Sequence, residues 1–160
     1  MCAEDLGLST SRLSFAIVVG ASNIWIGDSR AYTTLHSDPF ENVYYVTSGV
    51  KIFKVAPPYF KKEMDVRKVK ECTFNGGLEV EEDGGYVRWI KNTLEDVVER
   101  RPELERFVYE VRVEEGMVFY LPFGWFHEVR SEGVSVSYNF WWDGEYDLKW
   151  SLMEGVGEEI

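Results

Sequence analysis

The chain has 160 residues, of which 45% are hydrophobic and 16% aromatic, so we expect one globular domain over residues 1–160. The formal net charge of −11 argues against a nucleic-acid partner, because such a partner requires a basic surface. The same charge is compatible with a basic protein partner, although acidity also serves solubility alone.

The cysteine count and the apolar runs predict the compartment. Only Cys2 and Cys72 are present, too few for a disulfide framework, which favours a reducing, cytoplasmic or nuclear setting. The apolar run FAIVV (15–19) is too short to span a membrane, and no basic segment precedes it as in a signal peptide. We therefore expect neither a leader nor membrane association.

From residue 13 onward, short β-rich runs are separated by Gly, Pro, Asn and Asp, which is the pattern of a β-sandwich or barrel. The stretches TSG (47–49), EEGM (114–117) and SEG (131–133) predict hairpin turns, with Gly49 free to adopt a positive φ. The expected strands are 14–19, 22–27, 31–36, 42–47, 50–56, 107–113, 117–121, 126–130 and 133–142.

The middle of the chain, about 57–106, has a different pattern. Two prolines end the preceding strand, and Pro102 ends a short helix expected at about 93–100. We interpret this part as a helix-containing insertion on one rim of the barrel. Its charged run KKEMDVRKVKE (61–71) is expected to be a solvated loop, the alternative being a lip that grips a partner.

The chain has only two histidines, His36 and His127, and the first stands two residues before Asp38. Alternate residues of a strand share a face, so His36 and Asp38 can converge on one point. With His127 from another strand they would form a facial set of two histidines and one carboxylate, which leaves one side of a metal open. A structural His–Asp hydrogen bond would explain the first pair equally well.

Two further patterns point to a polar interior. Lys51 lies in the apolar run VKIFKVAPP, and a buried ammonium requires an anion unless it reaches solvent from an edge strand. In the last strand, Val134, Val136, Tyr138 and Phe140 alternate with Ser135, Ser137, Asn139 and Trp141. The polar set suits a barrel interior only if that interior holds a polar ligand.

Three segments resemble the JmjC-type Fe(II)/2-oxoglutarate oxygenases of the cupin superfamily, with the lysyl-hydroxylase branch the most similar. They are NIWIGDSRAYTTLHSDPFENVYYVTSGVKIFKVAPP (23–58), EEGMVFYLPFGWFHEVRS (114–131) and SVSYNFWWDGEYDLKWS (135–151). The resemblance implies a mainly β double-stranded β-helix (a jelly-roll or cupin barrel). It also implies Fe(II), 2-oxoglutarate as co-substrate, O2, and hydroxylation of a protein side chain, lysyl above all, with release of succinate and CO2.

The resemblance assigns roles position by position. His36, Asp38 and His127 would be the iron ligands, and Lys51 with Thr33 would hold the distal carboxylate of 2-oxoglutarate. The positions that would line or pack against the co-substrate pocket are Asn42, Tyr44, Asn139 and Trp141. The implied partner is a protein substrate, with a GTP-binding protein among the candidates, and neither nucleic acid nor a membrane.

The chain also departs from the family. The N-terminal helical region expected before His36 is missing or reduced, and Glu128 stands where relatives carry a second histidine. EYDLKWSLMEGV (145–156) is expected to form one short helix. Three alternatives stay open: an N-methyl-lysine demethylase, a cupin metalloprotein acting on a small molecule without 2-oxoglutarate, and a non-catalytic binding module. The sequence does not indicate an oligomeric state.

Overall fold

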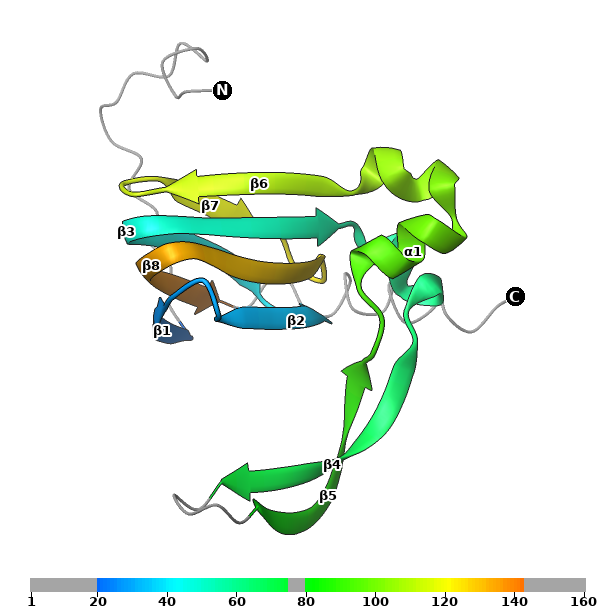
Figure 1. Cartoon of the computed structure of the whole chain (residues 1–160). Coiled ribbons are helices and arrows are strands. Elements are labelled where there is room, and N and C mark those ends of the chain that lie inside the picture. The colour runs from blue at the N-terminus through cyan, green and yellow to red at the C-terminus, as the bar shows by residue number, and fades with distance from the viewer. Residues whose placement is uncertain (1–19, 75–79, 143–160) are drawn as a thin grey trace.

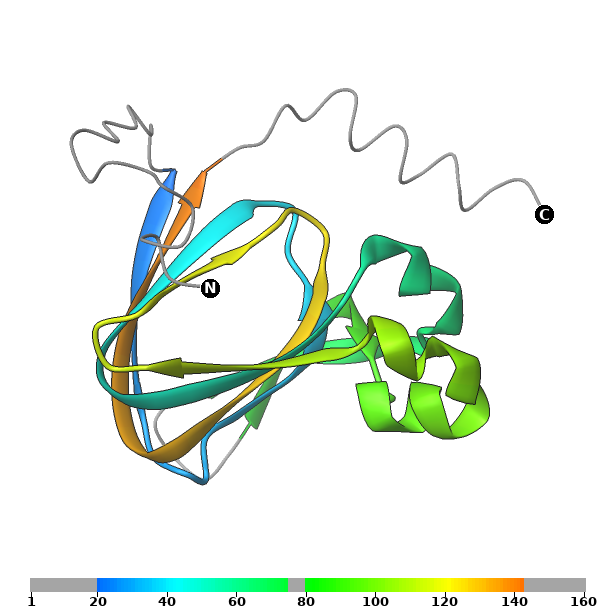
Figure 2. The ribbon, with the colours of Figure 1, turned by 90° about the horizontal axis from the view of Figure 1, so that it is seen from above.

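A computed structural model describes residues 20–74 and 80–142, so the expected strand at 14–19 and the expected helix at 145–156 lie outside the described residues. Six antiparallel strands form a barrel, which Figure 2 shows end-on with the helices on one side. The strands are β1 (Ala21–Gly27), β2 (Tyr32–Ser37), β3 (Glu41–Ala56), β6 (Tyr109–Glu114), β7 (Val118–Leu121) and β8 (Phe126–Trp142). This confirms the predicted mainly β class.

Two long strands, β3 and β8, organise the barrel by pairing with each other over nearly their whole length. The other edge of β8 pairs first with β2 and then with β1, while the other edge of β3 pairs with β7 and then with β6. Figure 1 shows this arrangement as two stacked layers that share the long strands. Every one of these pairings therefore joins segments that are distant in sequence.

The predicted hairpins at 47–49 and 131–133 are wrong, because β3 and β8 run continuously through both positions. The pairing register shifts between Val46 and Val50, so this stretch is a bulge, and Gly49 adopts a φ of 74° within it. Because a bulge inserts an extra residue, the inward-facing positions of β3 change at this point. They are even-numbered before the bulge, as in Asn42 and Tyr44, and odd-numbered after it, as in Lys51. The third predicted turn, EEGM, is confirmed between β6 and β7, where Gly116 has a φ of 82°.

Gly49→Ala is expected to destabilise the protein strongly. A Cβ at this position would lie 2.2 Å from the Val134 carbonyl oxygen, in addition to the strain of a positive φ. The loss should be about 3 kcal/mol or more. Gly116→Ala is the matched control: its φ is similar but a Cβ would meet nothing within 4 Å, so it should cost only about 1 kcal/mol. Denaturant unfolding of both variants tests this, and equal losses would contradict the bulge geometry.

The segment between β3 and β6 leaves the barrel. It contains η2 (Pro58–Glu63), β4 (Val66–Phe74), β5 (Val80–Ile90), α1 (Leu94–Arg100) and η3 (Pro102–Phe107). The helix predicted at 93–100 is confirmed, and Thr93 and Asp96 form a reciprocal capping box at its start. The loop predicted at 61–71 is wrong, because that run ends η2 and begins β4. Strands β4 and β5 form a two-stranded ribbon that projects from the barrel (Figure 1).

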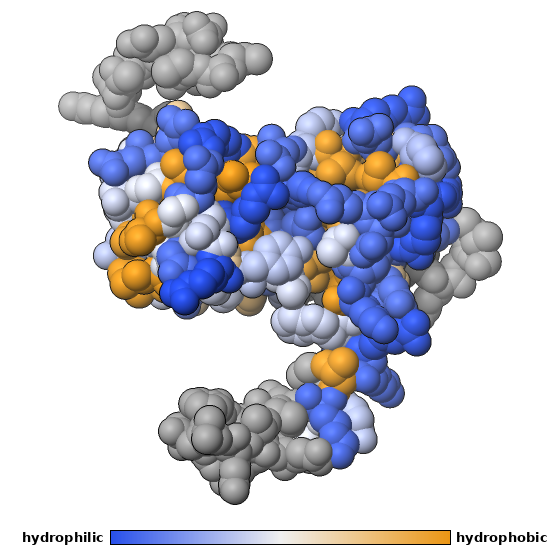
Figure 3. All heavy atoms as spheres, in the orientation of Figure 1, coloured by the Kyte–Doolittle hydropathy of each residue, from blue (hydrophilic) through white to orange (hydrophobic). Residues whose placement is uncertain are grey.

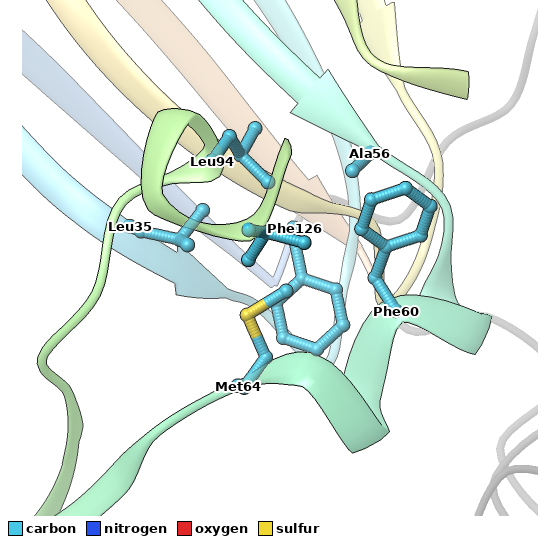
Figure 4. Close-up of a cluster of buried hydrophobic side chains, with 7 residues drawn as sticks. Leu35, Ala56, Phe60, Met64, Leu94 and Phe126 are labelled. Atoms are coloured by element: carbon cyan, nitrogen blue, oxygen red, sulfur yellow. The ribbon is translucent and has the colours of Figure 1, made fainter. Parts of the chain in front are cut away.

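Two apolar clusters form the core. One lies inside the barrel around Phe53, Val46 and Leu121. The other lies where the insertion meets the barrel, and Figure 4 shows its side chains converging from β2, β3, η2, α1 and β8. Its labelled members are Leu35, Ala56, Phe60, Met64, Leu94 and Phe126. This second cluster fixes the insertion against the end of the barrel that carries His36.

The end of the barrel formed by β1 and the last half of β8 is polar inside and apolar outside. Ser135, Ser137 and Asn139 are fully buried, whereas Val134 is 71% exposed. Outward-facing apolar side chains also gather at this end of the molecule in Figure 3, with hydrophilic side chains over the helical end. Among the described residues, no helix is long and apolar enough to cross a membrane.

Candidate metal centre and co-substrate pocket

His36, Asp38 and His127 lie together at one end of the barrel. Asp38 Oδ2 is 3.9 Å from His36 Nε2 and 3.7 Å from His127 Nε2, and the two imidazole ring centroids are 4.1 Å apart. The ligand atoms of all three residues lie within 4.8 Å of one another. The structure therefore brings together the three residues that the sequence predicted as one ligand set, with room between them for an ion.

The backbone around the triad sets its geometry. His36 and His127 are direct partners across the β2–β8 ladder, which places their side chains side by side. Asp38 follows the last residue of β2 instead of lying on the strand, and its carbonyl oxygen accepts a hydrogen bond from the Gly124 amide at 3.0 Å. The Gly124 bond ties the β2 end to the turn that precedes His127, so all three ligands are held by one local frame.

Hydrogen bonds orient both imidazoles for metal binding. His36 Nδ1 lies 2.7 Å from the Thr34 carbonyl oxygen, and His127 Nδ1 lies 3.0 Å from the Trp125 carbonyl oxygen. A carbonyl accepts but cannot donate, so each Nδ1 carries a proton and each Nε2 is the ring nitrogen that faces Asp38. Metal-binding histidines in proteins are oriented in this way.

His127 is the strongest sign that the triad fits a cation. It is 1% exposed, and its Nε2 has no hydrogen-bond partner. Burial, together with repulsion from His36, lowers the pKa of His127 to about 3, so its ring stays neutral. Burial raises the pKa of Asp38, which indicates a carboxylate lacking enough compensating positive charge. A neutral imidazole with an unused buried lone pair beside a desolvated carboxylate suits a divalent metal.

Lys51 lies deeper in the barrel. It is 7% exposed, and its Nζ donates to Ser131 Oγ at 3.0 Å. Among the described residues it has no carboxylate partner, and burial lowers the pKa of its ammonium. It therefore does not reach solvent, which was the alternative to an anion-binding role. Ser131, which the sequence did not single out, is its one hydrogen-bonding neighbour in the part of the chain that the structure describes.

Lys51→Met is expected to leave the ligand-free protein at least as stable as the wild type. The variant removes a buried cation and keeps the volume, and such replacements are often neutral or stabilising. Because folding lowers the pKa of Lys51 below its usual 10.5, the unfolded chain binds more protons at alkaline pH. Wild-type stability should then rise with pH toward 10.5 through this group, and the variant should lose that slope.

Thermal unfolding of both proteins between about pH 7 and 10 measures the effect. The control is Lys54→Met, on the opposite face of the same strand, where the ammonium bonds Glu95. A Lys51→Met protein that is less stable than the wild type at every pH would contradict a desolvated, unpaired ammonium.

The ladder arranges the inward-facing residues in levels. Val55, His127 and His36 form one level, and Phe53, Val129 and Thr33 form the next. Lys51 and Ser131 form the level after that. Thr33 thus lies between the triad and Lys51. Lys51 lies four positions before Val55 in β3, which corresponds to about 13 Å of strand. A lysine side chain and a five-carbon dicarboxylate together can span this distance.

The part of the barrel interior formed by β1, the start of β3 and the end of β8 is lined by amide, hydroxyl and indole groups. Asn139 Nδ2 donates to Asn42 Oδ1 at 3.2 Å, and Trp25 Nε1 donates to Asn139 Oδ1 at 2.8 Å. Three of the buried donors in this group have no partner: Asn42 Nδ2, Ser137 Oγ and Trp141 Nε1. Unpaired buried donors are costly, so their presence favours a site for a polar ligand.

The remaining predicted residues, Tyr44 and Trp141, border this region differently. Tyr44 is 6% exposed and packs edge-on against Phe53 at 4.9 Å between ring centroids, and burial raises its pKa. Trp141 stacks on Phe40 at 5.3 Å, so its ring packs against the chain between Asp38 and β3. Glu128, the departure from the family pattern, is buried next to His127 on the other face of β8 and accepts a hydrogen bond from Tyr32.

A groove with a volume of about 500 Å³ opens beside the triad. Its end is formed by His36 and Asp38, and its floor by buried side chains of the second core cluster. The β4–β5 ribbon forms one wall. The arrangement therefore has a polar barrel interior on one side of the triad and an open groove on another.

Comparison with known proteins agrees with this geometry. The family described as "Cupin-like domain" matches residues 5–148. The chain belongs to the cupin-like family. Its relatives in this family are JmjC proteins, which confirms both the family resemblance and the cupin type of barrel.

Three of these relatives are similar over most of the chain. Human "Bifunctional peptidase and (3S)-lysyl hydroxylase JMJD7" is 35% identical over 142 residues, which cover 84% of this chain and 45% of that protein. "JmjC domain-containing protein E" of Dictyostelium discoideum is 29% identical, covering 97% and 51%. "Lysine-specific demethylase JMJ32" of Arabidopsis thaliana is 28% identical, covering 94% and 49%. The chain thus spans about half the length of the curated relatives it matches.

Proposed function

We propose that this protein is an Fe(II)- and 2-oxoglutarate-dependent oxygenase that hydroxylates a side chain of a protein substrate, with lysine as the target residue. The observation that carries the proposal is the pairing of two features in one barrel. A three-residue ligand set presents unused lone pairs, and a buried ammonium without a carboxylate lies two ladder levels away. Neither feature alone would separate this function from that of other cupin-like proteins.

The residues present fit the cofactors. His36 Nε2, His127 Nε2 and Asp38 Oδ2 would hold Fe(II), and Lys51 with Thr33 would bind the distal carboxylate of 2-oxoglutarate. With O2, this group supplies the oxidation of an unactivated C–H bond, releasing succinate and CO2. Asn42 and Asn139 would line the pocket as hydrogen-bonding partners, with Tyr44 and Trp141 packing around it.

The chain itself contributes positioning. The ladder fixes the imidazoles, and the buried interior keeps bulk water from Lys51, so a bound carboxylate would meet a strong, desolvated donor. The groove admits a substrate side chain to the open face of the triad without crossing the co-substrate pocket. Binding of co-substrate and substrate from different directions suits a reaction that needs both at one centre.

The lysyl target rests on the relatives. One relative's name gives a (3S)-lysyl hydroxylase. The sequence resemblance implies a GTP-binding protein as the candidate substrate to test first. Mass spectrometry of the product decides the reaction: we expect a lysine-containing peptide to gain one oxygen atom. Unchanged mass in all lysine, arginine and histidine peptides, with 2-oxoglutarate still consumed, would contradict hydroxylation of such a side chain.

Demethylation is the second candidate, because three relatives are named lysine-specific demethylases. The same assay with an N-methyl-lysine peptide separates the two reactions, since loss of a methyl group differs from gain of an oxygen. A non-catalytic binding module predicts neither product, and predicts partner binding that survives the loss of His36 or His127.

A further inference from the structure

The groove beside the triad has a basic wall, in a protein whose net charge is −11. Lys61 from η2 and Arg88 from β5 line it, and Trp89, 47% exposed, stands beside Arg88. Among the residues that the structure describes, Asp38 at the end of the groove is the one carboxylate in its lining. Its apolar floor and cationic rim therefore suit an amphipathic occupant with negative charge.

The ribbon extends this wall outward. Residues directly opposite each other in an antiparallel pair share a face, so Val66 and Ile90, then Lys68 and Arg88, lie in order on the face that borders the groove. Lys70 follows on the same face, opposite Tyr86. Figure 3 shows apolar surface where the ribbon leaves the barrel and hydrophilic surface next to it farther along.

The pairing of Lys68 with Arg88 has no structural benefit in the ribbon itself. Like charges directly opposite each other destabilise a strand pair, and this pair belongs to a two-stranded ribbon with no further strand to support it. Both side chains are exposed, and among the described residues neither has a carboxylate partner. By contrast, Arg67 on the other face pairs with Asp65 at 2.7 Å.

We propose that this face of the ribbon binds an acidic segment of the substrate polypeptide, with Lys68 and Arg88 pairing with its carboxylates while the target side chain enters the groove beside His36. The inference rests on the proposed function and adds the chemistry of the segment around the target residue.

The ribbon geometry gives the spacing. An extended peptide along the ribbon rises by about 3.3 Å per residue, the same as the strands themselves. Arg88 lies two residues beyond Ile90 in β5, and Lys68 lies directly opposite Arg88. With the target residue level with Ile90 at the groove, the substrate should therefore carry Asp or Glu about two residues from the target, on one side only.

Peptide is favoured over nucleic acid by charge. The basic residues occupy one ribbon face and one rim, whereas the whole chain carries −11, which would repel a polyanion longer than the ribbon. A short acidic segment needs only the local field.

The test measures binding without turnover, in anaerobic full-length protein with Fe(II) and 2-oxoglutarate. A fluorescent peptide with a central lysine and Asp two residues beyond it is compared by polarisation with its Asn counterpart. At low salt we expect the Asp peptide to bind about tenfold more tightly. Lys68→Glu and Arg88→Glu should each weaken it about threefold to tenfold. Lys62→Glu, the same charge change at an exposed η2 position outside the groove lining, should leave the affinity unchanged.

A charge-swap experiment separates the loss of a specific contact from misfolding of the variants, because a misfolded protein would not gain a new preference. The double variant Lys68→Glu/Arg88→Glu should prefer a peptide with Arg at that position. Equal binding of Asp and Asn peptides, no effect of either ribbon variant, or equal competition by a short oligonucleotide would each overturn the inference. Failure of the proposed function is a separate result, since it would remove the response to 2-oxoglutarate in the same protein without altering the charge preference of the ribbon.

Discussion

Lys51→Met is expected to abolish measurable 2-oxoglutarate binding while iron binding persists. The ammonium is buried, its hydrogen-bonding neighbour is the Ser131 hydroxyl, and no carboxylate among the described residues competes for it. Truncating one member of a buried charge pair costs about 2–5 kcal/mol, which raises Kd at least about thirtyfold. Isothermal titration of the iron-loaded, anaerobic protein with 2-oxoglutarate measures this.

Two controls make the result specific. Lys54→Met, on the outer face of the same strand, should bind 2-oxoglutarate like the wild type. Succinate, which lacks the keto group that iron would bind, should compete weakly with 2-oxoglutarate through the Lys51 end alone. Unchanged 2-oxoglutarate affinity in Lys51→Met would show that the buried ammonium serves another purpose.

Asp38→Ala is expected to lower the affinity for Fe(II) by more than about a hundredfold, because changes even in groups that only orient metal ligands cost about tenfold to a hundredfold. The carboxylate is also the one negative charge among the three predicted ligands. Equilibrium dialysis against Fe(II) under anaerobic conditions provides the measurement.

The matched control is Asp28→Ala, which removes an exposed carboxylate paired with Arg30 in the turn before β2. It should bind iron normally. If Asp38→Ala also bound iron normally, the ligand assignment would be wrong, whatever the fold. Thermal unfolding of both variants checks that the difference does not come from a loss of folded protein.

The sequence predicted the triad because its signal is local and rare. Two histidines in the whole chain, one beside Asp38, leave few possible ligand sets, and the strand period places the first two close together. The exact position of Asp38 just beyond β2 made no difference, since its backbone is tied to Gly124. By contrast, Ser131 carries no local signal, and only the pairing of β3 with β8 places it beside Lys51.

The hairpin errors have a physical cause. A polar pair followed by glycine suits a turn and a bulge equally well, because both require a positive φ at one residue. Which one forms depends on the partner strand, and β3 pairs with a strand about 80 residues away in the chain. A continuous strand forms because both edges of β3 are paired along its length, and a hairpin at Gly49 would prevent this pairing.

The sequence did not predict the β4–β5 ribbon, for a related reason. Strands are recognised by one buried face, but every residue from Val66 to Lys70 is exposed, so hydrophobic alternation gives no signal there. The net charge of −11 is compatible with a basic partner or with solubility alone, whereas the wall of the groove is locally basic. Total charge describes the field at a distance, while the residues at the groove decide which segment can bind there.

The most direct test of the central claim is an anaerobic titration with Fe(II) and then 2-oxoglutarate, followed by visible absorption. We expect a saturable metal-to-ligand charge-transfer band that needs both components and is absent in Asp38→Ala and Lys51→Met. Iron binding without any band at saturating 2-oxoglutarate would contradict the proposed function, because the barrel would then hold a metal but no pocket for this co-substrate.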